Sequence, residues 1–599
     1  MKWPMLAALL LSGLMSFAGN RETPAQRDER LRWWREGRFG MFVTWGPVSI
    51  EGTEISWSRA GEKRGTTGTG VIPGGKEIPA EIYDNLYKQF NPKRFDAREW
   101  VAIARDAGMR YMVLTAKHCD GFCLWDSKVD RYSIGATPFK RDICGELAQA
   151  AHRAGMKLGW YYSPMDWRDP DCRTERNEVY VRKMQGHLRE LFGTYGTIDL
   201  AWFDSEGGPC PWHQADTYAL VRGLQPRIII NDRLGIGSGT PFDRDHPDED
   251  ADYRTPEQRV GAFDNQHPWE TCMTLGSQWA WKPDDTLKTA DECIRILVQC
   301  ITGDGNLLLN VGPMPDGRIE PRQAEVLRQV GAWLRKYGES VYGTRGGPFR
   351  NGRWGGSATK GNAVYLHILS WDNDRIELPP LPKKIVASAI LAGGTAVKVV
   401  YDEKRIVVTR DHGTRAACDD IVRLELEAPL GPMEALALPA RRTMEDVSIA
   451  LADPPREPYA VHDAGSLVDG IRGSSDRLDG KWLGFFDEPC EAVIHFQEEK
   501  RLRSVSVGCL QDQASRAFYP TAIEIACSDD GRTYREAGRV DYGEPRLDAE
   551  IRPHDFTVSF APVTARYLKV RLLSVGLCPS WHVAAGSKAW LLVDEIGVQ

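Results

Sequence analysis

Through the first half of the chain, from about residue 38 to residue 342, short apolar runs alternate with amphipathic segments. The runs at 39–43, 111–114, 158–162, 198–203, 228–230 and 307–309 predict strands. Between them, stretches such as REWVAIARDAGM and NEVYVRKMQGHLRELFGTYG carry apolar residues at helical spacing. Apolar strands that alternate with helices predict a parallel sheet covered on both faces. At this length we expect a (β/α) TIM-like barrel rather than an open sheet.

The second half of the chain has a different pattern, in which short alternating strands are separated by turn residues. Residues 346–445 include AVYLHIL, AVKVVYD and IVRLELE and predict a β-sandwich domain. The Pro-rich stretch LADPPREPYA lies at a predicted linker, 446–459, and residues 460–599 predict a second β-sandwich. The length of 599 residues agrees with three domains, of which the barrel at 19–345 is the first. The predicted fold class is therefore α/β.

The N-terminal stretch MKWPMLAALLLSGLMSFAGN has the features of a signal peptide. Lys2 supplies a positive charge, a short apolar stretch follows, and Ser16-Phe17-Ala18 provides a small-x-small cleavage site. We therefore expect residues 1–18 to be removed on export and the protein to be secreted or periplasmic; a buried N-terminal helix is the alternative. The apolar stretch is too short to span a bilayer and no later run is long enough, so no membrane span is expected.

Composition and charge narrow the range of partners. The formal net charge of -7 argues against a nucleic-acid binder, because it implies no basic face. The thirteen cysteines include no CxxC pair and no zinc spacing, and several lie in apolar runs, which indicates small core residues. The sequence thus predicts no metal and no cofactor, and it does not reveal the oligomeric state.

The strongest candidate for chemistry is the stretch IDLAWFDSEGG. An apolar strand delivers Asp204 directly after Trp202 and Phe203, and the glycines beyond it would let a ligand approach. In a barrel, polar residues at the C-terminal ends of the strands form the active site. Apolar surroundings penalise a charged carboxylate unless it is paired or used, so we expect Asp204 to be catalytic; a helix N-cap is the alternative.

A second candidate cluster follows the second strand, in LTAKHCDGFCLWDS. It holds Lys117, His118 and Asp120, and the aromatic residues Phe122 and Trp125 come soon after. Hydrogen-bonding groups beside aromatic rings are what a sugar pocket requires. A metal site has less support, because His118 lacks a second histidine at ligand spacing, and a structural histidine is the other alternative.

Hydrolysis of a glycosidic bond with retained configuration at the anomeric carbon needs a carboxylate nucleophile and a second carboxylic acid about 5–5.5 Å away. Two candidates for this acid, Glu257 in DYRTPEQ and Glu270 in HPWETC, follow on a predicted long loop, and the residues alone do not decide between them. Arg233 in IIINDRLG would be a fixed cation that keeps a nearby carboxylate ionised or contacts the sugar; a surface salt bridge is its alternative.

Several of these stretches together resemble glycoside hydrolase family 29, the α-L-fucosidases. RFGMFVTWG, LTAKHCDGFCLWDS, KLGWYYSPMDW, LAWFD, IINDR and GNLLLNVGPMPDGRI carry the resemblance between about residues 30 and 345. It implies a (β/α) barrel, a C-terminal β-sandwich and a metal-free retaining mechanism. It also implies Asp204 as the nucleophile, with Glu257 as the first choice of acid/base and Glu270 as the second. We expect the substrate-binding residues to be Trp45, Trp57, His118, Cys119, Trp125, Tyr162, Trp202, Arg233 and Trp279.

Three positions depart from the family's pattern. Thr44 and Cys119 stand where the family usually has histidines, and Ser56 stands where it has a glutamate. Each lost hydrogen bond costs about 0.5–1.5 kcal/mol, so plain fucose should bind poorly unless other residues compensate. We therefore expect the substrate to carry a fucosyl residue substituted at the affected hydroxyls, for example sulfated, or a related L-sugar.

The last domain resembles a discoidin-type (factor 5/8 C) β-sandwich, through DGIRGSSDRLDGKWLGFF, FYPTAIEIACSDDGRTYREAG and ARYLKVRLL. Such domains commonly bind carbohydrate, and a purely structural appendage is the alternative. The sequence therefore predicts a retaining exo-glycosidase whose partner is an oligosaccharide or polysaccharide. The rival function is a non-catalytic glycan-binding protein with a decayed barrel, and a transglycosylase could use the same residues.

Overall fold

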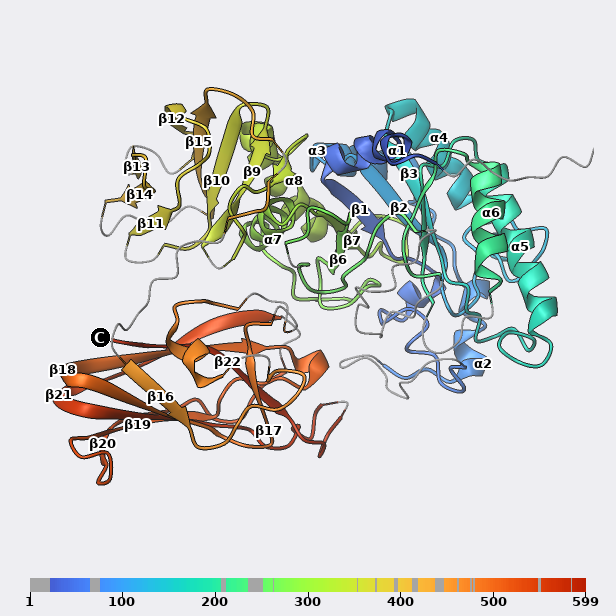
Figure 1. The fold of residues 1–599 in the computed structure, drawn as a ribbon. Coiled ribbons are helices and arrows are strands. Elements are labelled where there is room, and N and C mark those ends of the chain that lie inside the picture. The colour runs from blue at the N-terminus through green and yellow to red at the C-terminus, as the bar shows by residue number, and fades with distance from the viewer. Residues whose placement is uncertain are drawn as a thin grey trace, which may run out of the picture.

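The computed structural model describes residues 22–64, 76–205, 212–234, 251–261, 263–352, 354–371, 374–392, 397–411, 418–431, 433–436, 447–460, 463–473, 477, 480–547, 551–582 and 584–599. The predicted signal peptide at 1–18 lies outside the described residues. The described part is a mixed α/β protein in which one parallel sheet is followed along the chain by three antiparallel sheets (Figure 1). Within these ranges no helix combines the length and the apolar character that crossing a membrane requires.

The parallel sheet has the strand order β5-β4-β3-β2-β1-β7-β6, and every neighbouring pair in it is parallel. The bounds are β1 Phe39–Val43, β2 Tyr111–Lys117, β3 Lys157–Tyr162, β4 Leu200–Phe203, β5 Ile229–Ile230, β6 Glu270–Thr274 and β7 Asn306–Val311. The six predicted strands are all present, whereas β6 has no counterpart among them. Almost every residue of these strands is buried, as expected of a parallel sheet covered on both faces.

Helices connect the strands and cover the outer face of this sheet (Figure 1). Two of them are bounded by residues whose role is clear from the sequence. Asp142 caps α4 by accepting a hydrogen bond from a backbone N–H, and Gly155 ends the same helix in the left-handed conformation. Thr289 and Glu292 form a capping box at the start of α7. The helices are α1 Pro24–Gly37, α2 Ala80–Tyr83, α3 Ala97–Asp106, α4 Ile143–Ala154, α5 Asn177–Gly193, α6 Gln214–Leu224, α7 Ala290–Thr302 and α8 Pro321–Tyr337.

Alternate residues of the strands enter two different cores. Met41 and Trp160 belong to the largest apolar cluster, which lies between the sheet and the helices. Phe42 and Tyr161 belong to a second cluster on the inner face of the curled sheet, which also contains Trp34 of α1. This division follows from the period of two along a strand, and it decides which side chain at each strand end can reach the interior of the curled sheet.

The two edges of the parallel sheet are joined through an extended segment, 251–258. Isolated parallel bridges pair this segment with Asn231, which follows β5, and with Trp269 and Cys272 at β6. The residue that pairs with Cys272 is Glu257. The sheet is therefore a curled parallel half-barrel, and the segment that carries Glu257 lies between its two edges.

The second half of the chain forms antiparallel sheets, as predicted. A five-stranded sheet, β12-β15-β10-β9-β8, and a three-stranded sheet, β11-β14-β13, share one apolar core. Their strands are β8 Arg345–Gly346, β9 Gly355–Lys360, β10 Ala363–Ile368, β11 Arg375–Leu378, β12 Ile385–Ile390, β13 Val397–Tyr401, β14 Ile406–Arg410 and β15 Asp420–Leu426.

The third antiparallel sheet surrounds a separate apolar core near the C-terminus. Its strands are β16 Val447–Leu451, β17 Leu483–Phe486, β18 Cys490–Gln511, β19 Ala522–Ser528, β20 Arg535–Asp541, β21 Arg552–Leu573 and β22 Trp590–Val598. Strand β16 lies in the segment predicted as a linker and pairs with β18, so this sheet begins earlier in the chain than residue 460. The cysteines of the described ranges are free thiols and all but Cys418 are buried, which confirms that most of them are core residues.

Candidate active site

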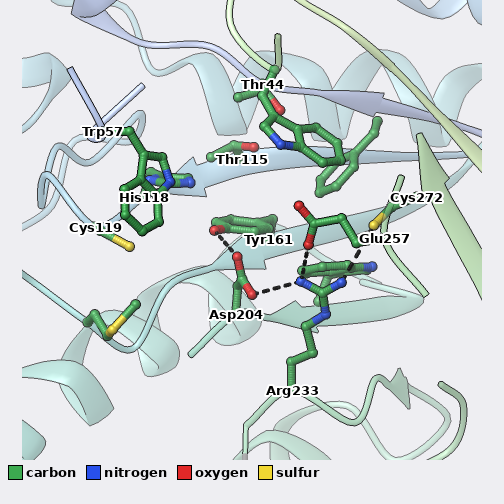
Figure 2. A pocket seen from close by; sticks show the side chains of 14 residues that line it. Thr44, Trp57, Thr115, His118, Cys119, Tyr161, Asp204, Arg233, Glu257 and Cys272 are labelled. Carbon is green, nitrogen blue, oxygen red and sulfur yellow. Dashed lines mark hydrogen bonds and ion pairs between the residues drawn. The ribbon is translucent and has the colours of Figure 1, made fainter. Parts of the chain in front are cut away.

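A pocket lies at the C-terminal edge of the parallel sheet, where the sequence predicts the site. Asp204 follows β4, His118 follows β2 and Thr44 follows β1. The inner-face cluster of aromatic residues forms the floor beneath them. The side chains that line the pocket are Phe42, Thr44, Trp57, Thr115, His118, Cys119, Tyr161, Met165, Trp202, Asp204, Arg233, Glu257, Cys272 and Trp279 (Figure 2).

The Asp204 carboxylate is held by a hydrogen bond on each oxygen. The Tyr161 hydroxyl donates to Oδ2 at 2.8 Å, and Arg233 Nη1 donates to Oδ1 at 3.1 Å. The Ser163 hydroxyl donates to the backbone carbonyl of Asp204 at 3.1 Å, which fixes the residue where the strand ends. These two donors fix the orientation of the carboxylate, and 21% of that side chain stays exposed. Asp204 is therefore both oriented and accessible from the pocket.

Arg233 lies between the two acidic residues of the pocket (Figure 2). Its Nη1 atom donates to Asp204 at 3.1 Å and to Glu257 Oε2 at 2.7 Å. Nε and Nη2 donate to the Thr255 hydroxyl and carbonyl, both at 2.8 Å, and the guanidinium lies 4.7 Å from the centre of the Trp202 ring. Burial disfavours the charge, but Glu257 and Asp204 outweigh it and raise the pKa of Arg233. The guanidinium is thus a fixed cation.

One nitrogen atom therefore brings two carboxylates together. Because Arg233 Nη1 contacts both, the nearest oxygens of Asp204 and Glu257 are no farther apart than the sum of those two contact distances. This agrees with the separation of about 5–5.5 Å that double displacement requires. Glu257 is the more exposed of the two, with 38% of its side chain accessible. The arrangement can support nucleophilic attack by one carboxylate and proton transfer by the other.

His118 is a neutral polar group in the wall of the pocket. Burial and the nearby Lys117 ammonium lower the pKa of His118 to about 3, so its imidazole carries no charge near neutral pH. Its Nδ1 atom lies 2.6 Å from the Ser56 hydroxyl oxygen. The ring stacks on Tyr161 with centroids 5.5 Å apart and planes 5° apart, and Tyr161 in turn stacks on Trp202. The stack fixes His118 relative to the Asp204 carboxylate.

Trp279 forms another wall of the pocket, and its backbone is held on both sides. Its N–H donates to Glu54 Oε2 at 2.8 Å, and its carbonyl accepts from Asn310 Nδ2 at 2.7 Å. Glu54 is fully buried, and burial raises the pKa of its carboxyl to about 7, although backbone N–H donors oppose this shift. The position of the indole ring therefore depends on two side chains from distant parts of the chain.

Comparison with known proteins identifies the family. A family model for α-L-fucosidases matches residues 17–339. The chain belongs to the α-L-fucosidase family. These enzymes are glycoside hydrolases, so the match also assigns the protein to an enzyme class. The chain is 31% identical over 385 residues to tissue α-L-fucosidase of Rattus norvegicus, covering 60% of this chain and 80% of the relative. It is 30% identical over 399 residues to plasma α-L-fucosidase of Homo sapiens, covering 61% and 81%.

Solved structures of α-L-fucosidases have the same fold. Isoenzyme 1 from Paenibacillus thiaminolyticus superposes with a TM-score of 0.59 at 32% identity, covering 67% of this chain and 99% of that chain. A family 29 enzyme from Bacteroides thetaiotaomicron, trapped as a covalent intermediate with 2-fluoro-fucosyl fluoride, superposes with a TM-score of 0.58 at 28% identity. That match covers 67% of this chain and 97% of the other. An α-L-fucosidase from a Vibrio species matches 94% of this chain in fold, at 20% identity and a TM-score of 0.61.

Most of the residues predicted to form the fucosidase site lie together in the pocket. These are the carboxylates Asp204 and Glu257, the cation Arg233, and Trp57, His118, Cys119, Trp202 and Trp279. Among the described residues, no group of three or more histidine, cysteine or acidic side chains is placed to hold a metal ion.

Glu270, the second candidate for the acid, lies elsewhere. It is the first residue of β6, at the opposite end of the sheet from the pocket. Its Oε2 accepts hydrogen bonds from Trp34 Nε1, at 2.9 Å, and from the Tyr111 hydroxyl, and the residue is fully buried. Burial raises its pKa to about 7. Glu270 is therefore a core residue at the base of the sheet, not a loop residue at the site.

Three predicted sugar contacts also lie outside the pocket. The Tyr162 hydroxyl lies 3.0 Å from His187 Nδ1 on the helix side of the sheet, because neighbouring residues of a strand point to opposite faces. Trp45 is buried against Phe90 and other outer-core rings, and its Nε1 donates to a backbone carbonyl. Trp125 donates from Nε1 to Glu190 at 2.8 Å and is 1% exposed. All three are structural residues of the outer core.

Five pocket residues were not predicted: Phe42, Thr115, Tyr161, Met165 and Cys272. Tyr161 is adjacent to Tyr162 in β3 and so lies on the opposite face, but the apolar pattern does not show which of the two faces lines the pocket. The Thr115 hydroxyl is buried without a hydrogen-bond partner among the described residues, which marks it as a polar group that faces the pocket. Cys272 and Met165 carry no signal in the sequence alone.

The three residues that depart from the family's pattern direct their polar atoms at protein partners. The Thr44 hydroxyl donates to Asn310 Oδ1 at 2.7 Å. The Cys119 sulfur lies 3.2 Å from the Ser163 hydroxyl, and the Ser56 hydroxyl lies behind His118 rather than in the pocket lining.

Proposed function

We propose that the protein hydrolyses terminal α-L-fucosyl residues of glycans with retention of configuration. The observation that carries this proposal is the shared contact of Arg233 Nη1 with the Asp204 and Glu257 carboxylates, which keeps the two groups close enough for double displacement. A related enzyme with the same fold was solved as a trapped covalent intermediate, which supports the same course for this chain. Nothing in the comparisons supports the alternative of a non-catalytic glycan-binding protein.

In the first step, an Asp204 oxygen attacks the anomeric carbon and forms a glycosyl ester. The glycosidic bond breaks as Glu257 gives its proton to the leaving oxygen. Tyr161 and Arg233 hold the Asp204 carboxylate in position for attack. In the second step, the Glu257 carboxylate takes a proton from water, whose oxygen attacks the anomeric carbon and releases the Asp204 carboxylate. Two inversions at that carbon give net retention.

The test of the nucleophile is the Asp204→Ala variant. We expect it to fold and to lose all but a trace of activity on an aryl α-L-fucoside. The control is Asp216→Ala on α6, whose carboxylate is 78% exposed and should leave turnover unchanged. Treating the wild type with 2-fluoro-fucosyl fluoride should add a fluorofucosyl mass to the peptide that contains Asp204. Near wild-type turnover by Asp204→Ala would refute the assignment.

We also propose that the preferred sugar is a fucose substituted on a hydroxyl, such as a sulfated fucose, or a related L-sugar. Support comes from Thr44, Ser56 and Cys119, whose polar atoms are engaged by protein groups instead of being free for sugar hydroxyls. Comparison of kcat/KM for plain and sulfated aryl α-L-fucosides is the test. Turnover of the plain substrate at the level of an ordinary fucosidase, with no gain on substitution, would rule this out.

The finer architecture that we propose is a (β/α) barrel at 19–345, a β-sandwich at 346–445 and a C-terminal discoidin-type β-sandwich that binds carbohydrate. The bridges of segment 251–258 to both sheet edges support a barrel. The separate core of the C-terminal sheet supports an independent domain. Glycan-array binding by the full-length Asp204→Ala variant, compared with the same variant truncated before β16, tests whether the last domain holds glycans.

We further propose that the protein is exported, with removal of residues 1–18. Its support is the basic, apolar and small-residue order of the N-terminal sequence. N-terminal sequencing of the protein recovered from the periplasm or the medium tests it, because an intact Met1 would contradict cleavage.

A further inference from the structure

The Ser56 hydroxyl has two neighbours that together fix the direction of its hydrogen bonds. The backbone N–H of Asp120 donates to Ser56 Oγ at 2.8 Å, and His118 Nδ1 lies 2.6 Å away on the other side. Ser56 is fully buried. Among the described residues, His118 Nδ1 is the one acceptor within reach of the hydroxyl proton, so Ser56 must donate to it.

A set of hydrogen bonds holds the Ser56 backbone beside Asp120 and so fixes where the Ser56 hydroxyl lies. The Ser56 N–H donates to the Tyr83 hydroxyl oxygen at 2.7 Å, and the Tyr83 proton goes to Asp120 Oδ2 at 2.8 Å. Asp120 Oδ1 accepts from the Phe122 N–H at 3.1 Å, so the carboxylate acts only as an acceptor. Backbone N–H groups cannot accept, so the Asp120 N–H can take no proton from Ser56 Oγ and leaves His118 Nδ1 as the acceptor.

The consequence for His118 is a single tautomer. With its Nδ1 lone pair occupied by the Ser56 proton, a neutral imidazole carries its own proton on Nε2. No described residue makes a hydrogen bond to Nε2, and the ring lines the pocket. We propose that Ser56 is a positioning residue that locks His118 as the Nε2–H tautomer, so that His118 offers the substrate a hydrogen-bond donor and no acceptor.

This inference rests on the proposed function and deepens it, because it sets what the facing sugar oxygen must do. A free hydroxyl can accept a bond from Nε2–H, and so can the oxygen of an ether, acyl ester or sulfate ester. A substituted oxygen has lost its proton but keeps its lone pairs. In the other tautomer, an unprotonated Nε2 would accept a hydrogen bond and would require a free hydroxyl on the sugar to donate it. The donor tautomer therefore allows a substituent on the oxygen that faces His118.

The backbone at Ser56 gives a clean way to remove the hydroxyl. Its φ is +57°, a conformation that glycine adopts freely and that costs most other residues strain. Ser56→Gly therefore deletes the hydroxyl without adding backbone strain. Ser58→Ala is the matched control, because the Ser58 hydroxyl is also buried but contacts Thr53 and not His118.

The first measurement is the ¹⁵N spectrum of ¹⁵N-histidine-labelled protein, with His118→Gln used to assign the signal among the 12 histidines. Burial raises the pKa of Asp120 to about 6, so the spectra are taken at about pH 8, where its carboxylate is ionised. We expect a protonated Nε2 and an unprotonated Nδ1 in the wild type and in Ser58→Ala. Ser56→Gly should give a mixture of tautomers. A wild-type spectrum with the proton on Nδ1 would overturn the proposal.

The second measurement is the kinetics of the same variants on aryl α-L-fucosides with and without a sulfate ester. We expect Ser56→Gly to raise KM by about fivefold to tenfold, as one weakened hydrogen bond to the sugar would, and to change kcat less. Ser58→Ala should change neither. An unchanged KM in Ser56→Gly would overturn the role of Ser56. If no fucoside is turned over, the proposed function fails, whereas the tautomer is still decided by the spectrum.

Discussion

Replacing Arg233 tests whether its charge allows two carboxylates to lie side by side. Arg233→Gln removes the charge and keeps an N–H donor, whereas Arg233→Lys keeps the charge and loses the fork that contacts Thr255. Both variants lose the geometry of the shared Nη1 contact. Only Arg233→Gln leaves Asp204 and Glu257 without a compensating cation, so the difference between the two variants reports the charge.

The size of the effect follows from the spacing of the two carboxylates. Two unit charges about 5.5 Å apart repel by about 3 kcal/mol at an effective dielectric constant of about 20, and by about 1 kcal/mol in water. The Asp204 and Glu257 side chains are 21% and 38% exposed, so the repulsion falls between these limits. An energy of about 1–3 kcal/mol corresponds to about 1–2 pH units.

The assay is the pH dependence of kcat/KM on an aryl α-L-fucoside. The active form has Asp204 ionised and Glu257 protonated, so unrelieved repulsion opposes loss of the Glu257 proton, which sets the alkaline limb. The alkaline limb of the Arg233→Gln profile should therefore move to higher pH by about 1–2 units. The alkaline limb of Arg233→Lys should stay near the wild-type position. Equal alkaline limbs for wild type and Arg233→Gln would refute the electrostatic argument.

Three further predictions concern stability and the pocket wall. Glu270 has a pKa of about 7 in the fold, above its ordinary value near 4.5, so its contribution to stability is present below pH 4.5 and lost as the pH rises through 7. Glu270→Gln should remove about 3 kcal/mol of the change in the free energy of unfolding between pH 4.5 and pH 7, measured with urea, and should leave turnover by the folded enzyme unchanged. If the free energy of unfolding of the variant depends on pH as that of the wild type does, the prediction is wrong. Gly40→Ala would place a methyl group 2.3 Å from the Tyr111 ring and should lower the free energy of unfolding by about 1–3 kcal/mol, so an unaltered urea midpoint would contradict this packing. Glu54→Gln should raise KM more than it lowers kcat, because the amide cannot accept from both N–H groups at Trp279 and Ala280; equal losses in both constants would contradict this role.

The sequence predicted the parallel sheet well because its strands are continuous apolar runs. It missed β6 for the opposite reason: ETCMT is mostly polar and has no such run. Long-range partners make two of its polar residues tolerable in the core: Trp34 and Tyr111 donate to Glu270 Oε2, and the Thr271 hydroxyl donates to the Arg259 carbonyl. Such long-range partners are invisible in a linear pattern.

The predictions for the candidate site were most accurate where a reactive side chain follows a strand. Asp204 was found because it follows an apolar run directly, and His118 because it lies in the polar stretch that follows the apolar run at 111–114. Tyr162 was chosen over Tyr161 because adjacent residues of a fully apolar strand give no sign of which face is which. The choice between Glu257 and Glu270 depended on their positions along β6: Glu270 begins the strand, whereas Glu257 lies in a connector beside Cys272, farther along it. The loop prediction concealed this difference.

The segment 251–258 has a consequence for how the two carboxylates can behave. Asp204 follows β4, which is hydrogen-bonded to a neighbouring strand on each side. The carboxylate that forms the covalent bond is therefore attached to a rigid part of the sheet. Glu257 is carried by a short connector that pairs with its neighbours through isolated bridges and not through a continuous strand ladder. Glu257 can therefore shift slightly between protonating the leaving oxygen and deprotonating the incoming water, while Asp204 keeps its position. Substitutions in the connector other than at Thr255, which holds Arg233, should therefore change proton transfer by Glu257 more than the covalent step.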